Sequence, residues 1–420
     1  MTEAKRRVVI TGLGALTPLA CGASASFEAM LAAKSGVRVL DRWENQDWST
    51  RIAGEVRNLT YIPEDHFSRK ELKRQDWFSQ VGVVAAREAW TDSGLTEGAF
   101  DPMRAGAILG TGIGGIQTIL DYHEVLKEKG PRRVTPFFIP NTMANALAGN
   151  IAIEHGLKGA CFLTSSACAS SGHAIGMAMR EIRDGRADVM MTGGAETTTN
   201  PLTMAGFMQL KALSTWNDRP EEASRPFDVE RNGFVMGEGA GALVIEELEH
   251  AKARGATIYC ELAGFGQTDD AGHITAPDPS GEMPSAAMRM AIQDGGLNAD
   301  EIDYVNAHGT STQMNDRIET LSLKMALGET AARQIAISST KSMTGHLIGA
   351  AAAVEAVVTA FTLYRGVAHQ TRNLENPDLE AGCDLDYIPD GPRESNFRAA
   401  LSNSLGFGGH NVCLAFRKFD

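Results

Sequence analysis

The sequence predicts an α/β protein made of two related halves. A fourteen-residue segment that begins at Ser165 aligns without a gap with one that begins at Ser338, and seven of the fourteen pairs are identical. Each segment follows a short apolar run and precedes a stretch rich in alanine, so each is expected to form a strand, a tight turn and the start of a helix. A Gly-x-Gly sequence, at 12–14 and 264–266, precedes each copy. The shared order of these features indicates a duplication.

Apolar runs that end in glycine or polar residues predict the strands. They are expected at 7–10, 105–109, 161–163 and 189–192 in the first half, and at 261–264, 304–306, 335–338 and 412–416 in the second. Helical patterns lie between them, for example at 80–93 and 281–294. Because strands alternate with helices, we expect mostly parallel sheets that are covered by helices.

The two halves are expected to meet near 249–257. This gives an N-terminal half of residues 1–255 and a C-terminal half of residues 256–420. No low-complexity linker separates them in the sequence, so we expect one compact unit. The first half carries insertions relative to the second, at about 41–77 and 121–145. Long insertions on a rigid scaffold usually carry function, so these segments are expected to contribute specificity and dimer contacts.

The composition narrows the classes of partner. With 39 basic and 52 acidic residues the net charge is −13, which argues against nucleic acid or an anionic membrane as the main partner. The start of the chain, 1–7, has a basic flank but no hydrophobic signal core, so a cytoplasmic location is expected. The longest apolar segment, 347–363, is rich in alanine and contains Glu355. It predicts a buried helix and not a membrane span.

The six cysteines show no CxxC pair and no cluster with histidine, so neither a disulfide framework nor a metal site is predicted. Cys168 nevertheless stands out, because it lies at an expected strand-to-helix turn between Ala167 and Ala169. Small neighbours permit a sharp turn, and the helix dipole favours a thiolate there, as a nucleophile requires. The alternative is a buried small apolar residue, which suits Cys161 on the strand better.

Two histidines follow other apolar runs and are candidates for the same site. His308 follows the run at 304–306, and His346 follows the run at 335–338. The ends of strands in an α/β sheet converge on one rim, so both imidazoles could meet Cys168 there. Each histidine alone also suits an ordinary surface or core position. The three together favour acyl transfer followed by stabilisation of a developing negative charge on oxygen.

Glycine-rich segments allow two further interpretations. Three glycines surround Phe407, and such a segment can bring a backbone N–H close to a reacting carbonyl, although plain turns share this composition. The glycines at 12–14 and 110–115 suggest nucleotide binding at first sight. Neither segment fits GxGxxG with an acidic residue at the right distance, so we reject that interpretation.

These motifs closely resemble the β-ketoacyl-acyl-carrier-protein synthases, in particular the elongating type II enzymes of fatty-acid synthesis. The resemblance covers almost the whole chain and implies a thiolase-like fold, with two α/β halves in a five-layer αβαβα arrangement, and a homodimer without an organic cofactor. Its most specific motifs are Ser166-Ala167-Cys168-Ala169, Arg225-Pro226-Phe227-Asp228, Gly233-Phe234-Val235-Met236-Gly237-Glu238-Gly239, Asn306-Ala307-His308-Gly309-Thr310-Ser311-Thr312, Ser339-Thr340-Lys341-Ser342-Met343-Thr344-Gly345-His346 and Gly406-Phe407-Gly408-Gly409.

The resemblance also implies roles for the candidate residues. Cys168 would take the acyl chain from acyl carrier protein as a thioester, with the N–H groups of Cys168 and Phe407 holding the oxyanion. His308 and His346 would stabilise the enolate that decarboxylation of malonyl-acyl carrier protein leaves. The resulting carbanion would attack the thioester and give a 3-oxoacyl product. Lys341 would order the histidine site.

Further positions follow from the same resemblance. Lys341 would act together with Glu355, near which the family allows a bound cation, and Phe407 would be a gate over the cysteine. The residues expected to bind substrate are Thr310 and Thr312, at the phosphopantetheine arm, and Ile113, Phe138 and Phe207, in the acyl pocket. Carrier protein is acidic, so a chain of net charge −13 needs a local basic surface to bind it. The candidates are Arg69, Lys70, Lys73 and Arg74. A solvated helix face that also carries Glu71 and Asp76 is the alternative.

The chain departs from the family pattern at three places. Leu405 stands where a phenylalanine is expected beside the gate, Gln313-Met314-Asn315 replaces a segment that usually contains proline, and Ser166 replaces a common threonine. The first two could alter gate motion or chain-length preference. A stand-alone ketosynthase of a polyketide or specialised-lipid pathway therefore stays open, as do acyl length and unsaturation.

Other members of the wider family fit the sequence less well. A non-catalytic subunit resembling a chain-length factor would lack the nucleophile, whereas this chain has Cys168 and both histidines. A thiolase would carry a second cysteine where Phe407 stands. An initiating synthase would pair one histidine with an asparagine.

Overall fold

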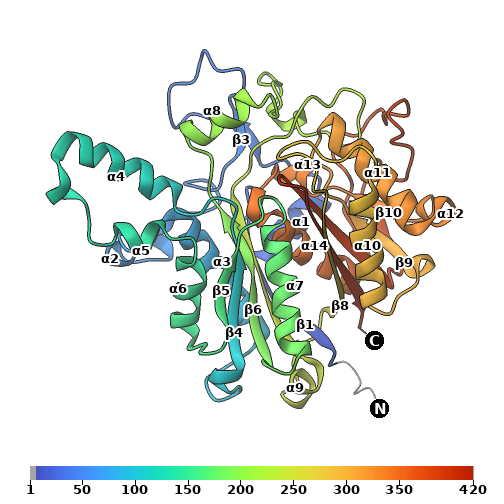
Figure 1. The fold of residues 1–420 in the computed structure, drawn as a ribbon, viewed down its shortest axis with the longest axis horizontal. Helices are drawn as coiled ribbons and strands as arrows, with labels where there is room; N and C mark the ends of the chain where they lie inside the picture. Colours follow the sequence, from blue (N-terminus) through green and yellow to red (C-terminus); the bar gives the residue numbers. More distant parts are fainter. Residues whose placement is uncertain (1–5, 420) are drawn as a thin grey trace.

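The computed structural model describes residues 6–419, so residues 1–5 of the basic starting segment lie outside the described part. Ten strands pair in the order β10-β9-β13-β14-β8-β1-β7-β6-β4-β5 (Figure 1). The first half supplies β1 (Val8–Leu16), β4 (Ala105–Gly110), β5 (Cys161–Thr164), β6 (Val189–Glu196) and β7 (Gly239–Glu247). The second supplies β8 (Cys260–Asp269), β9 (Ile302–Asn306), β10 (Ala336–Ser338), β13 (Ala399–Gly406) and β14 (His410–Lys418).

Both halves use the same strand order. When the five strands of each half are numbered along the chain, both sheets run 3-2-4-5-1. The halves join where Val9 and Ile10 of β1 pair with Glu261 and Cys260 of β8. An order this unusual in both halves supports the duplication inferred from the sequence.

The prediction of mostly parallel sheets was wrong. In each half only the strands β4, β5 and β6, or their counterparts β9, β10 and β13, pair in parallel. The other two strands of each half pair antiparallel, as in β6 with β7 and in β13 with β14. The short turn between β13 and β14 permits this, since antiparallel neighbours need no crossover helix.

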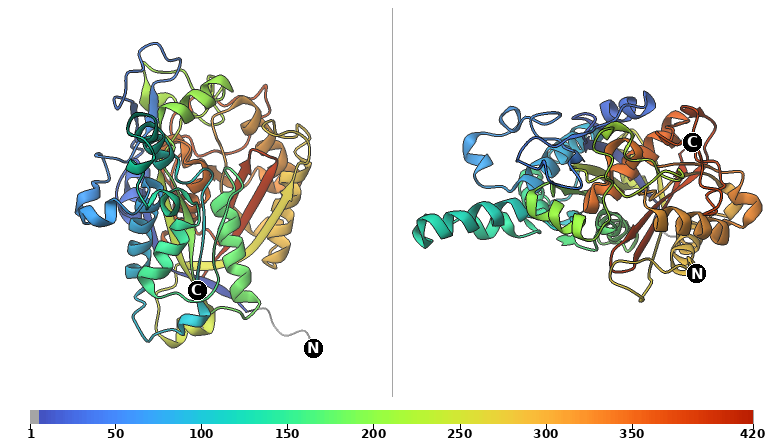
Figure 2. Two further views of the ribbon diagram at one scale, coloured as in Figure 1. Left: turned by 60° about the vertical axis from the view of Figure 1, so that its left-hand side comes forward. Right: turned by 90° about the horizontal axis from the view of Figure 1, so that it is seen from above.

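The helices complete five layers around the two sheets (Figures 1 and 2). The helices α3 (Trp77–Ser93) and α6 (Ala146–His155) cover the outside of the first sheet, and α10 (Glu282–Asp294) and α11 (Gln313–Leu327) cover the second. Between the sheets lie α7 (Ser170–Arg183) and α14 (Ala351–Arg365), each in contact with strands of both halves. The αβαβα fold is thereby confirmed.

The paired Gly-x-Gly sequences explain how the outer helices approach the sheets. A Cβ at Gly14 of β1 would lie 2.0 Å from the carbonyl oxygen of Ala85 in α3. A Cβ at Gly266 of β8 would lie 1.9 Å from the carbonyl oxygen of Ala287 in α10. Only glycine leaves room for such contact, so these residues serve helix packing at matching places in the two halves.

The central helix α14 accounts for the longest apolar segment. The helical stretch Ile348–Arg365 is long and apolar enough to cross a membrane, but 89% of it is buried inside the protein. It packs between the sheets and includes the fully enclosed Glu355. The prediction of a buried helix is confirmed.

The insertions of the first half form the elements on one side of the molecule. The segment 41–77 contains β3 (Ile52–Gly54), which pairs with β2 (Val37–Val39), and α2 (Arg69–Leu72). The segment 121–145 contains most of α4 (Ile116–Lys129), which projects from the body, and α5 (Phe138–Thr142) (Figures 1 and 2). The remaining elements are α1 (Ala23–Leu31), α8 (Pro201–Gln209), α9 (Leu248–Ala253), α12 (Glu329–Ala332), α13 (Lys341–Thr344), β11 (Val367–Ala368) and β12 (Arg393–Glu394).

Candidate active site

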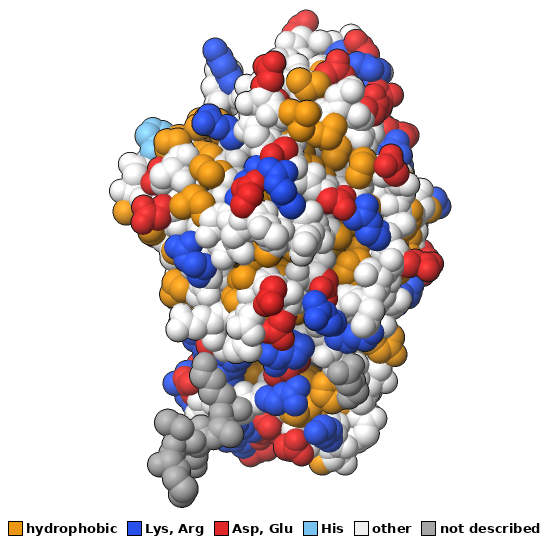
Figure 3. All heavy atoms as spheres, turned by 90° about the vertical axis from the view of Figure 1, so that its right-hand side faces the viewer, with side chains coloured by type: hydrophobic (Ala, Val, Ile, Leu, Met, Phe, Trp, Pro, Cys, Tyr) orange, Lys and Arg blue, Asp and Glu red, His pale blue; other side chains and the backbone are white. Residues whose placement is uncertain are grey.

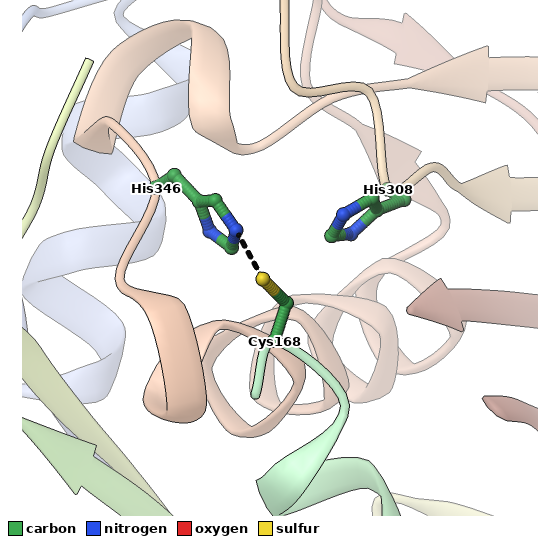
Figure 4. Close-up of side chains that lie close together, drawn as sticks. All are labelled: Cys168, His308 and His346. Atoms are coloured by element: carbon green, nitrogen blue, oxygen red, sulfur yellow. Dashed lines mark hydrogen bonds between the residues drawn. The ribbon is translucent and has the colours of Figure 1, made fainter. Parts of the chain in front are cut away.

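Three side chains from distant parts of the chain meet in one place (Figure 4). Cys168 follows β5, His308 follows β9 and His346 follows α13. His346 Nε2 lies 3.0 Å from Sγ of Cys168. The two imidazole rings are nearly perpendicular, with centroids 5.3 Å apart. The ligand-type atoms of all three side chains lie within 4.8 Å of one another, a spacing that would also suit a metal ion, which the sequence motifs did not indicate.

A strained turn holds the cysteine. Ala167 adopts a positive φ of 50°, a conformation that costs a residue other than glycine about 1–3 kcal/mol. The turn is closed by hydrogen bonds from Ser170 Oγ to the carbonyl oxygen of Ala167 and from the N–H of Ser166 to Ser170 Oγ, at 2.6 and 2.9 Å. Because α7 begins at Ser170, the thiol of Cys168 lies just before the N-terminus of this helix.

The resting cysteine is a thiol. Burial raises the pKa of Cys168 to about 11, although the charge of Lys341 and the N–H groups of Phe407 and Cys168 lower it. The expectation that the helix end would favour a thiolate is therefore not met in this resting site, because the enclosed sulfur loses its hydration when it is charged. His346 Nε2 is the neighbouring group that can accept the thiol proton.

Both histidines are neutral in this environment. Burial, together with the charge of Lys341, holds the pKa of His308 and of His346 well below its usual range. The Nδ1 atoms of both rings are buried and have no hydrogen-bond partner among the described residues. Neutral imidazoles carry one N–H donor each, which is the form needed to stabilise a negatively charged oxygen.

A buried carboxylate fixes the backbone at His308. Glu319 of α11 accepts hydrogen bonds from the N–H groups of His308 and Gly309, both at 2.8 Å. Burial raises the pKa of Glu319 to about 7, against the effect of these hydrogen bonds. Glu319 was not among the residues predicted from the sequence. Its spacing of three and four from Asp316 and Asn315, which are also buried on α11, was the available signal.

Lys341 forms an ion pair with Glu355, the partner suggested by the resemblance. Lys341 Nζ bonds Glu355 Oε1, and both side chains are 2% exposed. The second oxygen, Oε2, is buried and has no hydrogen-bond partner within the described range 6–419. This oxygen fits the cation that the family allows near Glu355, and a cation there would add positive charge behind the histidines.

The reacting side chains open into a cavity of about 590 Å³. Among its walls are the predicted residues Ile113, Phe207, Thr310, Thr312 and Phe407. The departures from the family pattern also line it, namely Leu405 and Gln313-Met314-Asn315. They are therefore placed where they can touch a bound substrate.

Phe138 does not reach the cavity of this chain. It lies on α5, with its ring 6.0 Å from that of Tyr122, and is not part of the cavity wall among the described residues. Phe207, by contrast, lines the cavity and packs against two other phenylalanines. Its ring centroid is 6.3 Å from that of Phe407 and 5.4 Å from that of Phe234.

Phe407 stands in the turn between β13 and β14, directly against the nucleophile. Gly408 and Gly409 have φ values of 90° and 82°, which favour glycine. A Cβ at Gly406 would lie 2.9 Å from the carbonyl oxygen of Ser166 and 3.3 Å from the nitrogen of Cys168. The backbone N–H groups of Phe407 and Cys168 both bond the sulfur and lower the pKa of the thiol.

The four predicted docking residues lie on and just after α2, and all four are exposed. Asp76, which might have neutralised them, is instead buried as the cap of α3 and accepts hydrogen bonds from the N–H groups of Phe78 and Thr118. Arg74 packs its guanidinium 4.8 Å from the ring of Phe137, next to α5. On the opposite face of the molecule, acidic and basic side chains are interspersed (Figure 3).

Known proteins resemble the chain along its whole length. Residues 5–251 match the β-ketoacyl synthase N-terminal domain, and residues 259–375 match the C-terminal domain. A protein of Vibrio cholerae named 3-oxoacyl-[acyl-carrier-protein] synthase 2 is 46% identical over 415 residues, covering 99% of each chain. A protein of the same name from Staphylococcus aureus is 45% identical over 415 residues, also covering 99% of each chain.

Solved structures show the same fold. A β-ketoacyl synthase from Burkholderia phymatum superposes with a TM-score of 0.91 at 37% identity, covering 99% of this chain and 100% of that one. A type II polyketide ketosynthase, solved with its acyl-carrier protein and bound to a hexaketide, superposes with a TM-score of 0.89 at 32% identity and the same coverage. The chain therefore belongs to the β-ketoacyl synthase family.

Proposed function

We propose that this protein is an elongating 3-oxoacyl-[acyl-carrier-protein] synthase of fatty-acid synthesis, an acyltransferase. The observation that carries the proposal is the thiol of Cys168, 3.0 Å from His346 and enclosed with a second neutral histidine in one cavity. The names of the full-length relatives support the same activity. In this proposal residues 1–255 supply the nucleophile and the insertions, and residues 256–420 supply both histidines, the lysine and the gate.

The first step transfers the acyl chain. Sγ of Cys168 attacks the thioester carbonyl of acyl-carrier protein while its proton passes toward His346 Nε2. The N–H groups of Cys168 and Phe407 hold the tetrahedral oxyanion. The intermediate collapses by breaking the bond to the phosphopantetheine sulfur, which leaves with the proton as a thiol. The chain is then bound to Cys168 as a thioester.

The second step forms the carbon–carbon bond. Malonyl-carrier protein binds and loses CO₂, and the electron pair of the broken bond forms an enolate. His308 donates an N–H hydrogen bond to the enolate oxygen, and His346 does the same from Nε2 once its ring proton has moved from Nδ1 to Nε2. Their neutral state suits both rings to this role. The enolate carbon attacks the Cys168 thioester, and the 3-oxoacyl product leaves on the carrier protein. Cys168 departs as the thiolate and takes up a proton from water, which replaces the one that left with the phosphopantetheine thiol, so the site returns to its starting state.

Carrier protein is proposed to dock at α2. Arg69, Lys70, Lys73 and Arg74 offer exposed positive charge that would attract an acidic partner to a chain of net charge −13. Thr310 and Thr312 face the cavity with their hydroxyls 3.0 Å apart, and would contact the phosphopantetheine arm. The relative solved with its acyl-carrier protein supports a partner of this kind.

We further propose a homodimer in the cytoplasm. β5 is the last strand of the sheet order, and its Cys161 and Phe162 are exposed, so its free edge can pair with a second copy. Phe138 would line an acyl pocket only if the dimer brought α5 against the partner's cavity. All six cysteines are free, which suits a reducing compartment.

A stand-alone ketosynthase of a polyketide or specialised-lipid pathway is the second candidate. The observation in its favour is that Leu405 and Gln313-Met314-Asn315 line the cavity, where they would alter substrate choice. A non-catalytic subunit is disfavoured because Cys168, His308 and His346 are all present and adjacent.

The test is intact-protein mass after incubation with saturated acyl-carrier proteins of graded length, followed by a chase with malonyl-carrier protein. We expect an acyl adduct that leaves as a 3-oxoacyl product. Absence of an adduct with every saturated chain would overturn the fatty-acid assignment. Loading restricted to polyketide intermediates would favour the second candidate.

A further inference from the structure

Glu196 is a buried carboxylate at the end of β6 that the mechanism above does not use. Its side chain is fully enclosed and accepts four hydrogen bonds. Three come from the segment after β4, namely from Thr111 Oγ1 at 3.1 Å, the N–H of Gly112 at 2.6 Å and the N–H of Ile113 at 3.3 Å. The fourth comes from the N–H of Gly349 at 3.1 Å, in the segment that leads into α14. One carboxylate thus joins the two halves.

The joined segments touch backbone to backbone. A Cβ at Gly349 would lie 2.2 Å from the nitrogen of Gly112 and 2.7 Å from Glu196 Oε2. A Cβ at Gly112 would lie 2.8 Å from the same oxygen. Neither glycine has room for a side chain, so the carboxylate and the two segments form one interlocked unit.

Each segment presents an isoleucine to the acyl cavity. Ile113 lines the cavity from the first half, and Ile348 lines it from the second. Ile348 has a φ of 44°, a strained value for a β-branched residue, which persists only where surrounding contacts enforce it. The hydrogen bond from the adjacent Gly349 to Glu196 is one of these contacts.

Glu196 itself does not touch the cavity. It is absent from the cavity wall, and all of its described partners are donors. Burial raises the pKa of this carboxyl group, while the hydrogen bonds from Gly112 and Gly349 oppose that effect. The residue has no direct contact with the reacting atoms. It holds two segments of the cavity wall, and its negative charge is one of the smaller effects that raise the pKa of Cys168.

We propose that Glu196 is a positioning residue that sets the chain-length preference by fixing the Ile113 and Ile348 walls of the acyl cavity. The inference rests on the proposed function and deepens it. Release of these walls would let the cavity accept chains that the native geometry excludes, so the loading rates of favoured and disfavoured chains would converge. The chemistry at Cys168 would be changed less, because its turn is closed by separate hydrogen bonds.

The first test is Glu196→Gln, which keeps the shape of the side chain but replaces one acceptor oxygen with a donor group. At least one backbone N–H then loses its acceptor. In the wild type the best and the worst saturated acyl-carrier protein differ in loading rate by some ratio. We expect this ratio to be at least fivefold smaller in the variant. Alkylation of Cys168 by iodoacetamide, a small reagent that needs no acyl pocket, should not fall below the wild-type rate, because the lost charge of Glu196 raised the pKa of the thiol.

Glu88→Gln is the matched control. Glu88 also accepts two backbone N–H bonds, from Ala15 and Ala23 at 2.8 Å each, but it lies on α3, away from the cavity. The Glu88→Gln variant should load acyl chains of each length in the same proportions as the wild type. If Glu196→Gln does not fold, Ile348→Gly tests the same wall, because glycine relieves the positive φ and removes the side chain. It should shift the profile in the same direction.

The outcomes separate the two proposals. A wild-type protein that loads no acyl chain would overturn the proposed function and this inference with it. Wild-type loading with an unchanged profile in the Glu196→Gln and Ile348→Gly variants would overturn the inference alone. A shift that Glu88→Gln reproduces would also overturn it, since the effect would then be general loosening of the fold.

Discussion

Cys168 and Lys341 occupy matching places in the two halves, each shortly after the third strand along the chain. Cys168 lies in the turn before α7, and Lys341 is the first residue of α13. In the first half the turn leads directly into the continuous helix α7, and the cysteine lines the cavity. In the second half the short α13 ends at Gly345, whose φ is 71°, and α14 begins only at Ala351. Lys341 then lies behind the cavity wall.

The interruption in the second half has a direct consequence for the site. The residues between α13 and α14 carry His346 to the sulfur of Cys168, a position that a continuous helix would not give it. Its counterpart in the gapless alignment, His173, lies within α7 and contacts Ser166 Oγ at 2.7 Å. In the proposed mechanism, one copy of the duplicated segment therefore carries the nucleophile, and the other carries the lysine and the histidine that act beside it.

The strongest test of this division is Cys168→Ala. We expect no acyl adduct by intact-protein mass, because the only described thiol in the cavity is lost. Decarboxylation of malonyl-carrier protein, measured by CO₂ release, should continue, since both histidines belong to the second half. Cys161→Ala, which removes an exposed thiol on β5, should load normally. Loss of decarboxylation in Cys168→Ala would contradict a division of labour between the halves.

The reciprocal test removes a histidine. In His308→Ala we expect decarboxylation to fall about 10²–10³-fold, the usual cost of losing one oxyanion donor. Acyl loading should fall much less, because the N–H groups of Cys168 and Phe407 remain. Single-turnover loading and CO₂ release measure the two steps separately. Equal losses in both steps would show that His308 acts on the whole site.

Lys341→Ala should act mainly on stability. Removal of the lysine leaves Glu355 charged, buried and unpaired, which costs about 3–5 kcal/mol in the free energy of unfolding. Urea denaturation measures this loss. The double variant Lys341→Met with Glu355→Leu should recover most of it, because no uncompensated charge remains. If Lys341→Ala were as stable as the wild type, the ion pair between Lys341 and Glu355 would not contribute to the stability of this region.

Much of this arrangement could be predicted from the sequence. Cys168, His308 and His346 each follow an apolar run, and the strand ends of an α/β sheet share a rim. The expected helices 80–93 and 281–294 match α3 and α10 closely. Glycine pairs in β1 and β8 marked the repeat, because helix packing demands the same small residue at both places.

Other features depend on burial, which the sequence pattern did not reveal. β7 and β13 were missed because alanine, glycine, serine and asparagine dominate them and favour strands only when neighbours pair with them. Glu196 and Glu319 were not predicted as buried residues, and Glu196 carried no local pattern that marks it as one. Burial is also the reason why Cys168 is a thiol in the structure and not the thiolate expected from the sequence. The distance of Phe138 from the cavity depends on the path of α5, which follows from no local pattern.

The pH dependence of Cys168 alkylation tests how burial and the charge of Lys341 each act on the thiol. Because burial raises the pKa of Cys168 to about 11, its iodoacetamide rate should rise about tenfold per pH unit between pH 8 and 10 without a plateau. Peptide mass spectrometry assigns the label to Cys168. Lys341→Met should lower the rate further, since the lysine charge favours the thiolate. A plateau below pH 9 would mean that the helix end outweighs burial.

The smallest expected effect concerns the docking surface, which belongs to the first half alone. Reversal of two charges on or next to α2, Lys70→Glu with Lys73→Glu, should raise KM for acyl-carrier protein roughly fivefold, with kcat little changed, because exposed charges steer encounter more than they hold the complex. The difference from wild type should shrink as salt is raised. Lys252→Glu, an exposed site on α9, is the control and should leave KM unchanged. An equal rise in KM in the control would assign the effect to net charge, and docking would then have to be sought outside α2.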